Sequence, residues 1–408
     1  MKIIKVEAFA IQAKNPDKQE YWGKRSWVSQ RQTDAASVVV RKGLEYPLKW
    51  RMKASYSDTI DTCIVKVTTD EGITGWGEAK APVAPQAAQT IVEQLLAPIV
   101  LGQDPFDIQL LWEKMYASMR LRGHMSGFFM EAISGIDIAL WDILGKAVNL
   151  PVHKLLGGMY RHEIELYGSG VPGLREGADQ AAVDDVIRDT QHIVEKGFKA
   201  VKIAGGHGVE ADLKTIEIVR SVVGNDRAIY LDAAGNYNLS KAMELGKLIQ
   251  GQGVGFLEAP IPPEFFEAYG QLAKQLEIPI ASDLITGRYQ AQEYFRHGGL
   301  DLAQPDVCRA GGISECKKIA DLADVYGAAF APHLSIGSAI HFAASAHLAA
   351  AVPNFMVMEY WIGDNPLGSA ILEQPFEAVN GVLPVPQGPG LGIVINEDAL
   401  LQHAVNRR

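Results

Sequence analysis

The 408-residue sequence has few cysteines and no excess of positive charge. Its three cysteines, Cys63, Cys308 and Cys316, show no CxxC spacing and are too sparse for a disulfide framework, which favours a reducing cytoplasm. The formal net charge of −10 argues against nucleic acid or an anionic membrane as a partner. An anionic substrate remains compatible with this charge, because a bound cation can invert the local field.

Long uninterrupted apolar segments are also missing. The first residues, MKIIKVEAFAIQAK, have neither a long apolar core nor a small-residue cleavage site, so we expect no signal peptide. The apolar stretch 328–352 contains three histidines and is not interpreted as a membrane span. With 48% hydrophobic residues, the chain can bury a large core, and its length fits one barrel of about 250 residues plus a smaller domain.

From about residue 129 the sequence alternates between short apolar runs and helical patterns. Eight strands are predicted, with the sequences EIELYG, FKAVKI, AIYLD, VGFLE, IPIASD, LDLAQPD, AAFAPH and FMVMEY. Seven connections separate them, and such an alternation predicts an α/β barrel of parallel strands over residues 129–362. Residues 1–128 read as a strand, a β-hairpin and amphipathic helices, which predicts an α+β domain. Residues 363–408 are rich in Pro and Gly and are expected to pack back onto that first domain.

Six ionisable residues recur at the ends of successive apolar runs, 23–27 residues apart: Asp232, Glu258, Asp283, Asp306, His333 and Glu359. One strand, one helix and two loops need about that length, since a βαβ unit takes roughly 30 residues. A polar residue at the same place in consecutive βα units indicates a site at the C-terminal ends of barrel strands.

Three of these residues, Asp232, Glu258 and Asp283, end adjacent predicted strands, which lie about 4.8 Å apart. Three unpaired carboxylates in a dry pocket are strongly unfavourable, and a hard divalent cation resolves the repulsion. All-oxygen ligation favours Mg²⁺ or Mn²⁺ over Zn²⁺. The alternative is that they are helix caps or solvent-facing loop acids. Glu258 fits this alternative poorly, because Glu is a poor cap.

The remaining strand-end residues suggest acid–base chemistry. His333 follows Asp306 by one unit, and a neighbouring carboxylate fixes the tautomer of a histidine and raises its basicity, which predicts a general base. Lys202 could neutralise a substrate carboxylate or an enolate oxygen. Glu359, if buried among anions, should have a raised pKa and could donate a hydrogen bond to the substrate. The alternatives are a structural histidine and a simple Lys202–Asp232 pair.

Taken together, these motifs resemble the enolase superfamily and, within it, the mandelate racemase subgroup. The resemblance rests on GITGWGE, ISGIDIALWDILGKAVNLPVHKLLGG, GFKAVK, LDAAGNY, FLEAP, IASD, QPDVCRAGGI, APH and MEY. It implies an α+β capping domain on a modified (β/α)7β TIM-like barrel, and Mg²⁺-assisted removal of the proton α to a carboxylate. It further implies that Asp232, Glu258 and Asp283 bind the metal, that His333 and Asp306 form the catalytic dyad, and that Glu359 touches the carboxylate.

One position departs from the family pattern. Many members carry Lys-x-Lys at the end of the second strand, whereas this chain has Lys202-Ile203-Ala204. Period-2 alternation puts Lys202 and Ala204 on the same inward face, so a second base is missing there. Racemisation needs a base on each face of the enolate, whereas His333 alone can remove the α-proton and then protonate a departing β-hydroxyl.

We therefore predict an Mg²⁺-dependent dehydratase that converts an acid sugar, an aldonate or aldarate, into a 2-keto-3-deoxy acid. Two alternatives stay open. One is a racemase or epimerase in which His207 or Lys202 acts on the second face, and the other is a non-catalytic metal-binding relative. Candidates for substrate contacts are Trp22, Arg25, Arg51, Arg122 and His207, against which stands plain surface solubility. From the resemblance, a homo-oligomer is expected.

Overall fold

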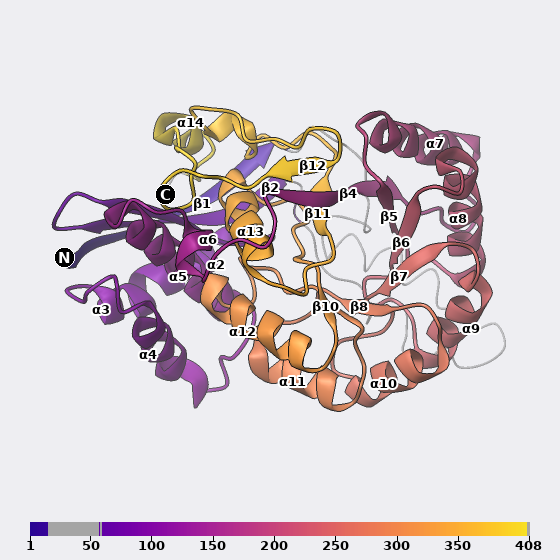
Figure 1. The fold of residues 1–408 in the computed structure, drawn as a ribbon, viewed down its shortest axis with the longest axis horizontal. Coiled ribbons are helices and arrows are strands. Elements are labelled where there is room, and N and C mark those ends of the chain that lie inside the picture. Colours follow the sequence, from indigo (N-terminus) through magenta and orange to yellow (C-terminus); the bar gives the residue numbers. More distant parts are fainter. Residues whose placement is uncertain (15–56, 58, 406–408) are drawn as a thin grey trace.

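The computed structural model describes residues 1–14, 57 and 59–405. Figure 1 shows an antiparallel sheet with its helices beside a larger barrel of strands and surrounding helices. This arrangement confirms the predicted fold class, a modified (β/α)7β barrel with an N-terminal α+β domain. No helix among the described residues is both long enough and apolar enough to cross a membrane.

The N-terminal sheet consists of β1 (Ile3–Lys14), β2 (Thr59–Thr69) and β3 (Thr74–Ala79), paired antiparallel in that order. The tight turn between β2 and β3 contains Gly72, whose φ of 80° is left-handed and suits glycine. Three helical segments pack on the sheet, namely α2 (Pro85–Ile91), η2 (Val92–Leu96) and α5 (Phe128–Ala147). Helices α3 (Ala97–Val100) and α4 (Ile108–Arg120) contact η2 and α5, respectively.

Strand β3 lies directly against α5, and its glycines permit this close approach. A Cβ at Gly77 would come 1.8 Å from the carbonyl oxygen of Gly135, and one at Gly75 would come 2.1 Å from that of Ala139. The GITGWGE sequence is thus required by packing, because any side chain at these two positions would push strand and helix apart.

Helix α5 begins at the residue before the predicted barrel, yet its apolar residues pack into the core of the N-terminal sheet. Ile133, Ile136, Leu140 and Ile143 share one buried cluster with residues of β2 and with α4. The opposite side of α5 meets the barrel, where Asp137 accepts a hydrogen bond from the backbone of Ser314. Helix α5 therefore joins the two halves of the molecule, after which α6 (Val152–Leu155) leads into the barrel.

The barrel strands are parallel and follow one another in sequence order. They are β4 (Glu163–Pro172), β5 (Ala200–Ala204), β6 (Ala228–Asp232), β7 (Val254–Glu258), β8 (Ile280–Ser282), β9 (Leu302–Ala303), β10 (Ala329–Phe330) and β11 (Met358–Trp361). Strand β11 pairs with β4, and a bridge between Phe330 and Phe355 closes the ring. All eight strands lie at predicted positions.

The helices that connect the strands form the outer layer of the barrel (Figure 1). They are α7 (Gln180–Glu195), α8 (Val209–Val223), α9 (Leu239–Ile249), α10 (Phe266–Gln275), α11 (Arg288–Arg296), α12 (Gly312–Val325) and α13 (Ala339–Ala351). Inside the ring, Tyr167, Tyr230 and Phe256 pack with alanine, leucine and valine side chains into a buried layer. This layer forms the floor beneath the C-terminal strand ends.

The C-terminal segment contacts both halves of the molecule. Strand β12 (Val382–Pro384) pairs antiparallel with the start of β4, after the short helix η3 (Ser369–Ile371). Further on, Glu397 of α14 (Glu397–Leu401) forms an ion pair with Lys66 of β2, and Ala404 bridges to Ile11 of β1. The segment after residue 363 therefore touches the barrel as well as the N-terminal sheet.

Candidate active site

The structure gathers Asp232, Glu258, Asp283, Asp306, His333 and Glu359 at one end of the barrel, and we call them the strand-end cluster. Asp232 and Glu258 are the last residues of β6 and β7 and are register partners. Asp283 directly follows β8, and Asp306 and His333 follow β9 and β10. Every member is buried except Asp283, whose side chain is 12% exposed. The recurrence in the sequence thus corresponds to one site in space.

Lys202 of β5 reaches into this cluster. Its Nζ lies 2.8 Å from an oxygen of Glu359, 3.0 Å from one of Glu258 and 3.5 Å from one of Asp232. Burial opposes its charge, but the attraction of Glu258 and Glu359 outweighs burial and holds the pKa of Lys202 well above its ordinary value. These carboxylates therefore favour the charged form of Lys202.

The carboxylates around Lys202 carry more negative charge than one lysine balances. Burial, together with the charge of Asp283, raises the pKa of Asp232 to about 6 even though Lys202 lowers it. Burial and the charge of Asp232 likewise raise the pKa of Glu258 well above its ordinary value. The side-chain amide of Gln304, which sequence reasoning missed, donates a hydrogen bond of 3.0 Å to Glu258.

These residues fit a divalent cation. Ligand atoms of Glu258, Asp283 and His333 all lie within 4.8 Å of one another, and Asp232 lies beside Glu258 in register. The donors are chiefly carboxylate oxygens with uncompensated charge, which is the chemistry that Mg²⁺ prefers. The guanidinium group of Arg309, also missed from the sequence, lies 3.8 Å from Oδ2 of Asp283.

His333 and Asp306 form a buried pair. Nδ1 of His333 lies 3.0 Å from Oδ2 of Asp306. When Nδ1 donates its proton to that carboxylate, Nε2 is left as the basic nitrogen. Nε2 faces the cluster, 3.7 Å from Asp283 and 3.6 Å from Glu359. The dyad is thus assembled with its basic atom directed at the carboxylates.

Neighbouring groups stabilise the ionised form of Asp306. Burial would raise its pKa, but the charges of His341 and Lys80 and the hydrogen bond from His333 hold that pKa well below the ordinary value. Nζ of Lys80 lies 3.1 Å from Oδ2, and Nε2 of His341 lies 3.1 Å from Oδ1. Lys80 and His341 did not emerge from the sequence, because one belongs to the N-terminal domain and the other lies within helix α13.

The expectation that Glu359 has a raised pKa is wrong. Burial acts in that direction, but Lys202 and His333 outweigh it and hold the pKa well below the ordinary value. Glu359 also accepts hydrogen bonds from the backbone N–H groups of Leu334 and Ser335, at 3.0 and 2.8 Å. Glu359 is therefore ionised here, because its cationic and N–H partners compensate for the surrounding anions.

Of the predicted substrate contacts, Trp22, Arg25 and Arg51 lie outside the described residues and stay predictions. Arg122 is exposed in the turn between α4 and α5. His207 follows β5 and is half buried, with its backbone N–H bonded to Asp212 of α8. Its ring lies beside Gly173 at the end of β4, where a Cβ would come within 2.9 Å of it. The structure thus places His207 at the same end of the barrel as the strand-end cluster.

Comparison with known proteins agrees with this geometry. Residues 34–157 match the mandelate racemase / muconate lactonizing enzyme N-terminal domain, and residues 185–399 match the enolase C-terminal domain-like family.

Individual relatives span nearly the whole chain. D-galactarolactone cycloisomerase of Agrobacterium fabrum is 38% identical, covering 83% of this chain and 90% of its own. Arabinonate dehydratase of Saccharolobus solfataricus is 35% identical, and the match covers 81% of this chain and 87% of the relative. The solved 3,6-anhydro-D-galactonate cycloisomerase of Zobellia galactanivorans superimposes with a TM-score of 0.82 at 31% identity, covering 100% of both chains. The chain therefore belongs to the enolase superfamily, in its mandelate racemase subgroup.

Proposed function

We propose that the protein is an Mg²⁺-dependent dehydratase of an acid sugar. The observation that carries the proposal is the asymmetry of the site. A buried His333–Asp306 dyad faces the carboxylates from one side, whereas the corresponding position on β5 is Ala204. One base suffices for a syn elimination, in which the same imidazole removes a proton and returns it to the leaving group.

In this mechanism Asp232, Glu258 and Asp283 hold the cation, which when bound supplies positive charge that favours the enolate form of the substrate carboxylate. Lys202 is a fixed cation at the same place and adds to this stabilisation. His333 Nε2 takes the proton from the carbon α to the carboxylate, and the C–H electron pair enters the enolate. Asp306 holds the imidazolium that results.

The second half of the reaction uses the same residue. The carboxylate C=O bond re-forms, and the enolate electrons form a new Cα–Cβ double bond as the Cβ–O bond breaks. The imidazolium of His333 gives its proton to the departing hydroxyl, which leaves as water. Water and an enol are released, and the enol tautomerises to a 2-keto-3-deoxy acid. Every proton that His333 accepts is thus returned, and the dyad is restored.

The named relatives support an acid-sugar substrate. Besides the arabinonate dehydratase, a D-galactonate dehydratase of Verminephrobacter eiseniae is 34% identical over 83% of this chain. A second candidate is a cycloisomerase, favoured by the 38% identical relative and the superimposable structure that carry that name. It would use the same α-proton abstraction, with a ring oxygen as the leaving group and no loss of water.

The test is product analysis by proton NMR with Mg²⁺ and a panel of aldonates, aldarates and their lactones. A 2-keto-3-deoxy acid formed from an open-chain acid with loss of water supports the dehydratase. The same kind of product formed only from a cyclic substrate supports the cycloisomerase. Inactivity of the native protein across the panel, with His333→Asn as the blank, contradicts both. A cytoplasmic location and a homo-oligomeric state remain predictions.

A further inference from the structure

We propose that the end of strand β3 positions the catalytic base. Lys80 and Glu78, from the N-terminal domain, hold the barrel segment that carries His333, and they fix Asp306 behind it. They are positioning residues, since neither contacts the basic nitrogen. The proposal rests on the proposed function of His333, but the contacts on which it is built can be tested without any substrate.

Lys80 lies just beyond β3 and is almost fully buried between the two halves of the molecule. Its Nζ donates to Oδ2 of Asp306 at 3.1 Å and to the carbonyl oxygen of Leu334 at 2.6 Å. Leu334 is the residue after His333. One ammonium group therefore ties the carboxylate of the dyad to the backbone beside its histidine, and so sets their relative position.

Glu78 acts two residues earlier on the same strand. It accepts hydrogen bonds from the backbone N–H and the hydroxyl of Ser338, from the backbone N–H of His341 and from the hydroxyl of Thr62. Ser338 is the N-cap of α13, so a carboxylate here also suits the positive end of the helix dipole. Glu78 thereby fixes the far end of the segment that begins at His333.

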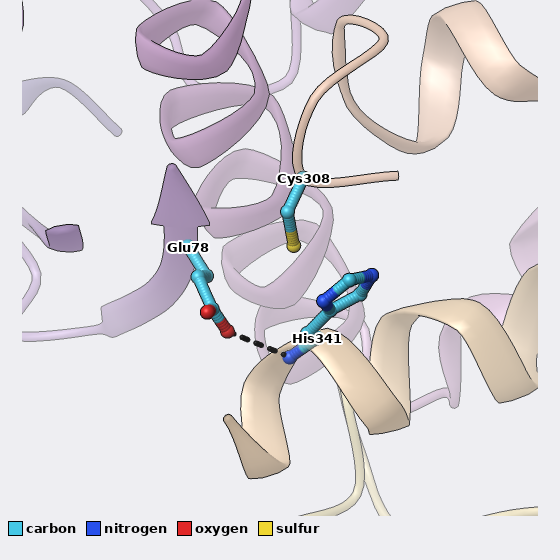
Figure 2. A group of neighbouring side chains, drawn as sticks. All are labelled: Glu78, Cys308 and His341. Atoms are coloured by element: carbon cyan, nitrogen blue, oxygen red, sulfur yellow. Dashed lines mark hydrogen bonds between the residues drawn. The ribbon is translucent and has the colours of Figure 1, made fainter. Parts of the chain in front are cut away.

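Figure 2 shows Glu78, Cys308 and His341 pointing toward one another from β3, from the loop after β9 and from the start of α13. These residues are close enough to hold a metal ion. We assign them to the positioning network instead, because both oxygens of Glu78 already accept hydrogen bonds. The ring of His341 faces Asp306, with Nε2 3.1 Å from Oδ1, so it supports the second oxygen of that carboxylate.

The consequence is a dependence of the base on the N-terminal domain. Side chains that orient a ligand or a base through a second residue typically cost 10- to 100-fold when removed. Loss of Lys80 should free Asp306 to turn and should leave the carbonyl of Leu334 without its donor. Nε2 of His333 would then sample directions other than the one that meets the α-carbon.

The test compares Lys80→Met with Lys66→Met. Both remove a lysine of the N-terminal domain that binds a carboxylate, but Lys66 pairs with Glu397, away from the cluster. We expect Lys80→Met to lower kcat about 10- to 100-fold with little change in KM, and to enlarge the isotope effect on kcat with α-deuterated substrate. Lys66→Met should change neither. A lower active fraction alone would reduce kcat without altering the isotope effect, and that result would overturn the proposal.

A second readout needs no turnover. In protein labelled with ¹⁵N-histidine, the Nδ1–H signal of His333, assigned by its loss in His333→Asn, should shift or broaden in Lys80→Met and persist in Lys66→Met. If Lys80→Met does not fold, Glu78→Gln serves instead. It should shift the same signal, because both carboxylate oxygens of Glu78 accept hydrogen bonds and an amide has only one oxygen that can. An unchanged signal in a folded variant refutes the positioning role. Failure of the substrate panel alone leaves this result standing and refutes only the proposed function.

Discussion

The two sides of the barrel mouth differ in how their charges are arranged. On the side of β9 and β10, the side chains of Lys80, His333 and His341 surround Asp306, and the backbone N–H of Cys308 donates a hydrogen bond to it. Its pKa is held well below the ordinary value despite burial. On the side of β6 and β7, burial and mutual repulsion raise the pKa values of Asp232 and Glu258, although the charge of Lys202 opposes both shifts and a hydrogen bond from the Ala234 backbone N–H also opposes that of Asp232.

This difference separates two roles. A carboxylate with every partner in place is suited to holding a base in one orientation. Carboxylates with too few cations are suited to taking up one more cation. The β5 position that could have supplied a base on the second face is Ala204, and the lysine beside it is held by three carboxylates. These features support our proposal that the proton is transferred from one side.

The largest effect is expected from removing the base. His333→Asn should lower turnover by about 100- to 10,000-fold, because His333 is the base that we propose takes the α-proton. Steady-state kinetics on the substrate identified by NMR provide the measurement, and circular dichroism checks that the variant is folded. Full activity in a folded variant would remove the dyad from the mechanism.

The next effect concerns the opposite side. Asp283→Ala should weaken Mg²⁺ binding on the order of 100-fold, because the affinity of oxygen sites depends on the number of charged ligands. Isothermal titration calorimetry measures it directly. Asp321→Ala is the matched control, since Asp321 pairs with Lys317 on the exposed side of α12. Equal Mg²⁺ affinities in the two variants would refute the ligand set.

A third change tests the charge balance without metal. Lys202→Met removes the cation that Glu258, Glu359 and Asp232 share, and breaking a buried ion pair costs about 3–5 kcal/mol. We expect the free energy of unfolding, measured by urea titration in EDTA at pH 8, to fall by that amount. Lys66→Met breaks a more exposed ion pair, with Glu397, and should lower the free energy of unfolding by at most about 1 kcal/mol. Similar losses of unfolding free energy in the two variants would contradict the view that Lys202 offsets an excess of buried negative charge.

The smallest expected effect is a pH dependence of the free energy of unfolding that comes from Asp212, near β5. Asp212 holds the loop of His207 through the N–H groups of Gly206 and His207, and burial raises its pKa to about 6. A carboxyl with a raised folded-state pKa binds its proton more tightly when folded. Its contribution to the free energy of unfolding is therefore largest below about pH 4 and falls as pH rises to about 6.

The contribution of Asp212 to the free energy of unfolding changes by about 3 kcal/mol at most over this pH range. Asp212→Asn should make the free energy of unfolding fall less steeply as pH rises. Urea titrations at pH 4, 5, 6 and 7 measure this slope. The comparison is between slopes, since the amide also changes the hydrogen bonds of the loop. If the slope between pH 4 and 6 is the same in both proteins, Asp212 does not carry the predicted shift.

Much of the barrel could be predicted from the sequence because its signals are periodic. Each βα unit has a similar length and ends its strand with an ionisable residue, so Asp232, Glu258, Asp283, Asp306 and His333 could be placed on one edge before their distances were known. The GITGWGE hairpin was likewise recognisable, and the structure adds the reason, which is the contact of Gly75 and Gly77 with α5.

Residues that act across the two domains could not be predicted. Lys80 and Asp306 are 226 residues apart, and no periodicity links them. The state of Glu359 also depended on unseen partners. Counting the neighbouring anions alone suggested a raised pKa for Glu359, whereas Lys202, His333 and a backbone hydrogen bond from Leu334 lower it. Ionisation states follow from the donors that surround a group, and a strand pattern does not contain them.

The most direct test of a one-sided base is the fate of the α-proton in D2O. The protein is incubated with Mg²⁺ and an acid sugar that it converts, and both product and remaining substrate are examined by proton NMR. The account predicts a 2-keto-3-deoxy acid with deuterium at C3, while the remaining substrate keeps its proton and its configuration at C2. Deuterium at C2 of the remaining substrate, together with its C2 epimer, would contradict the account by showing that a second base works from the other face.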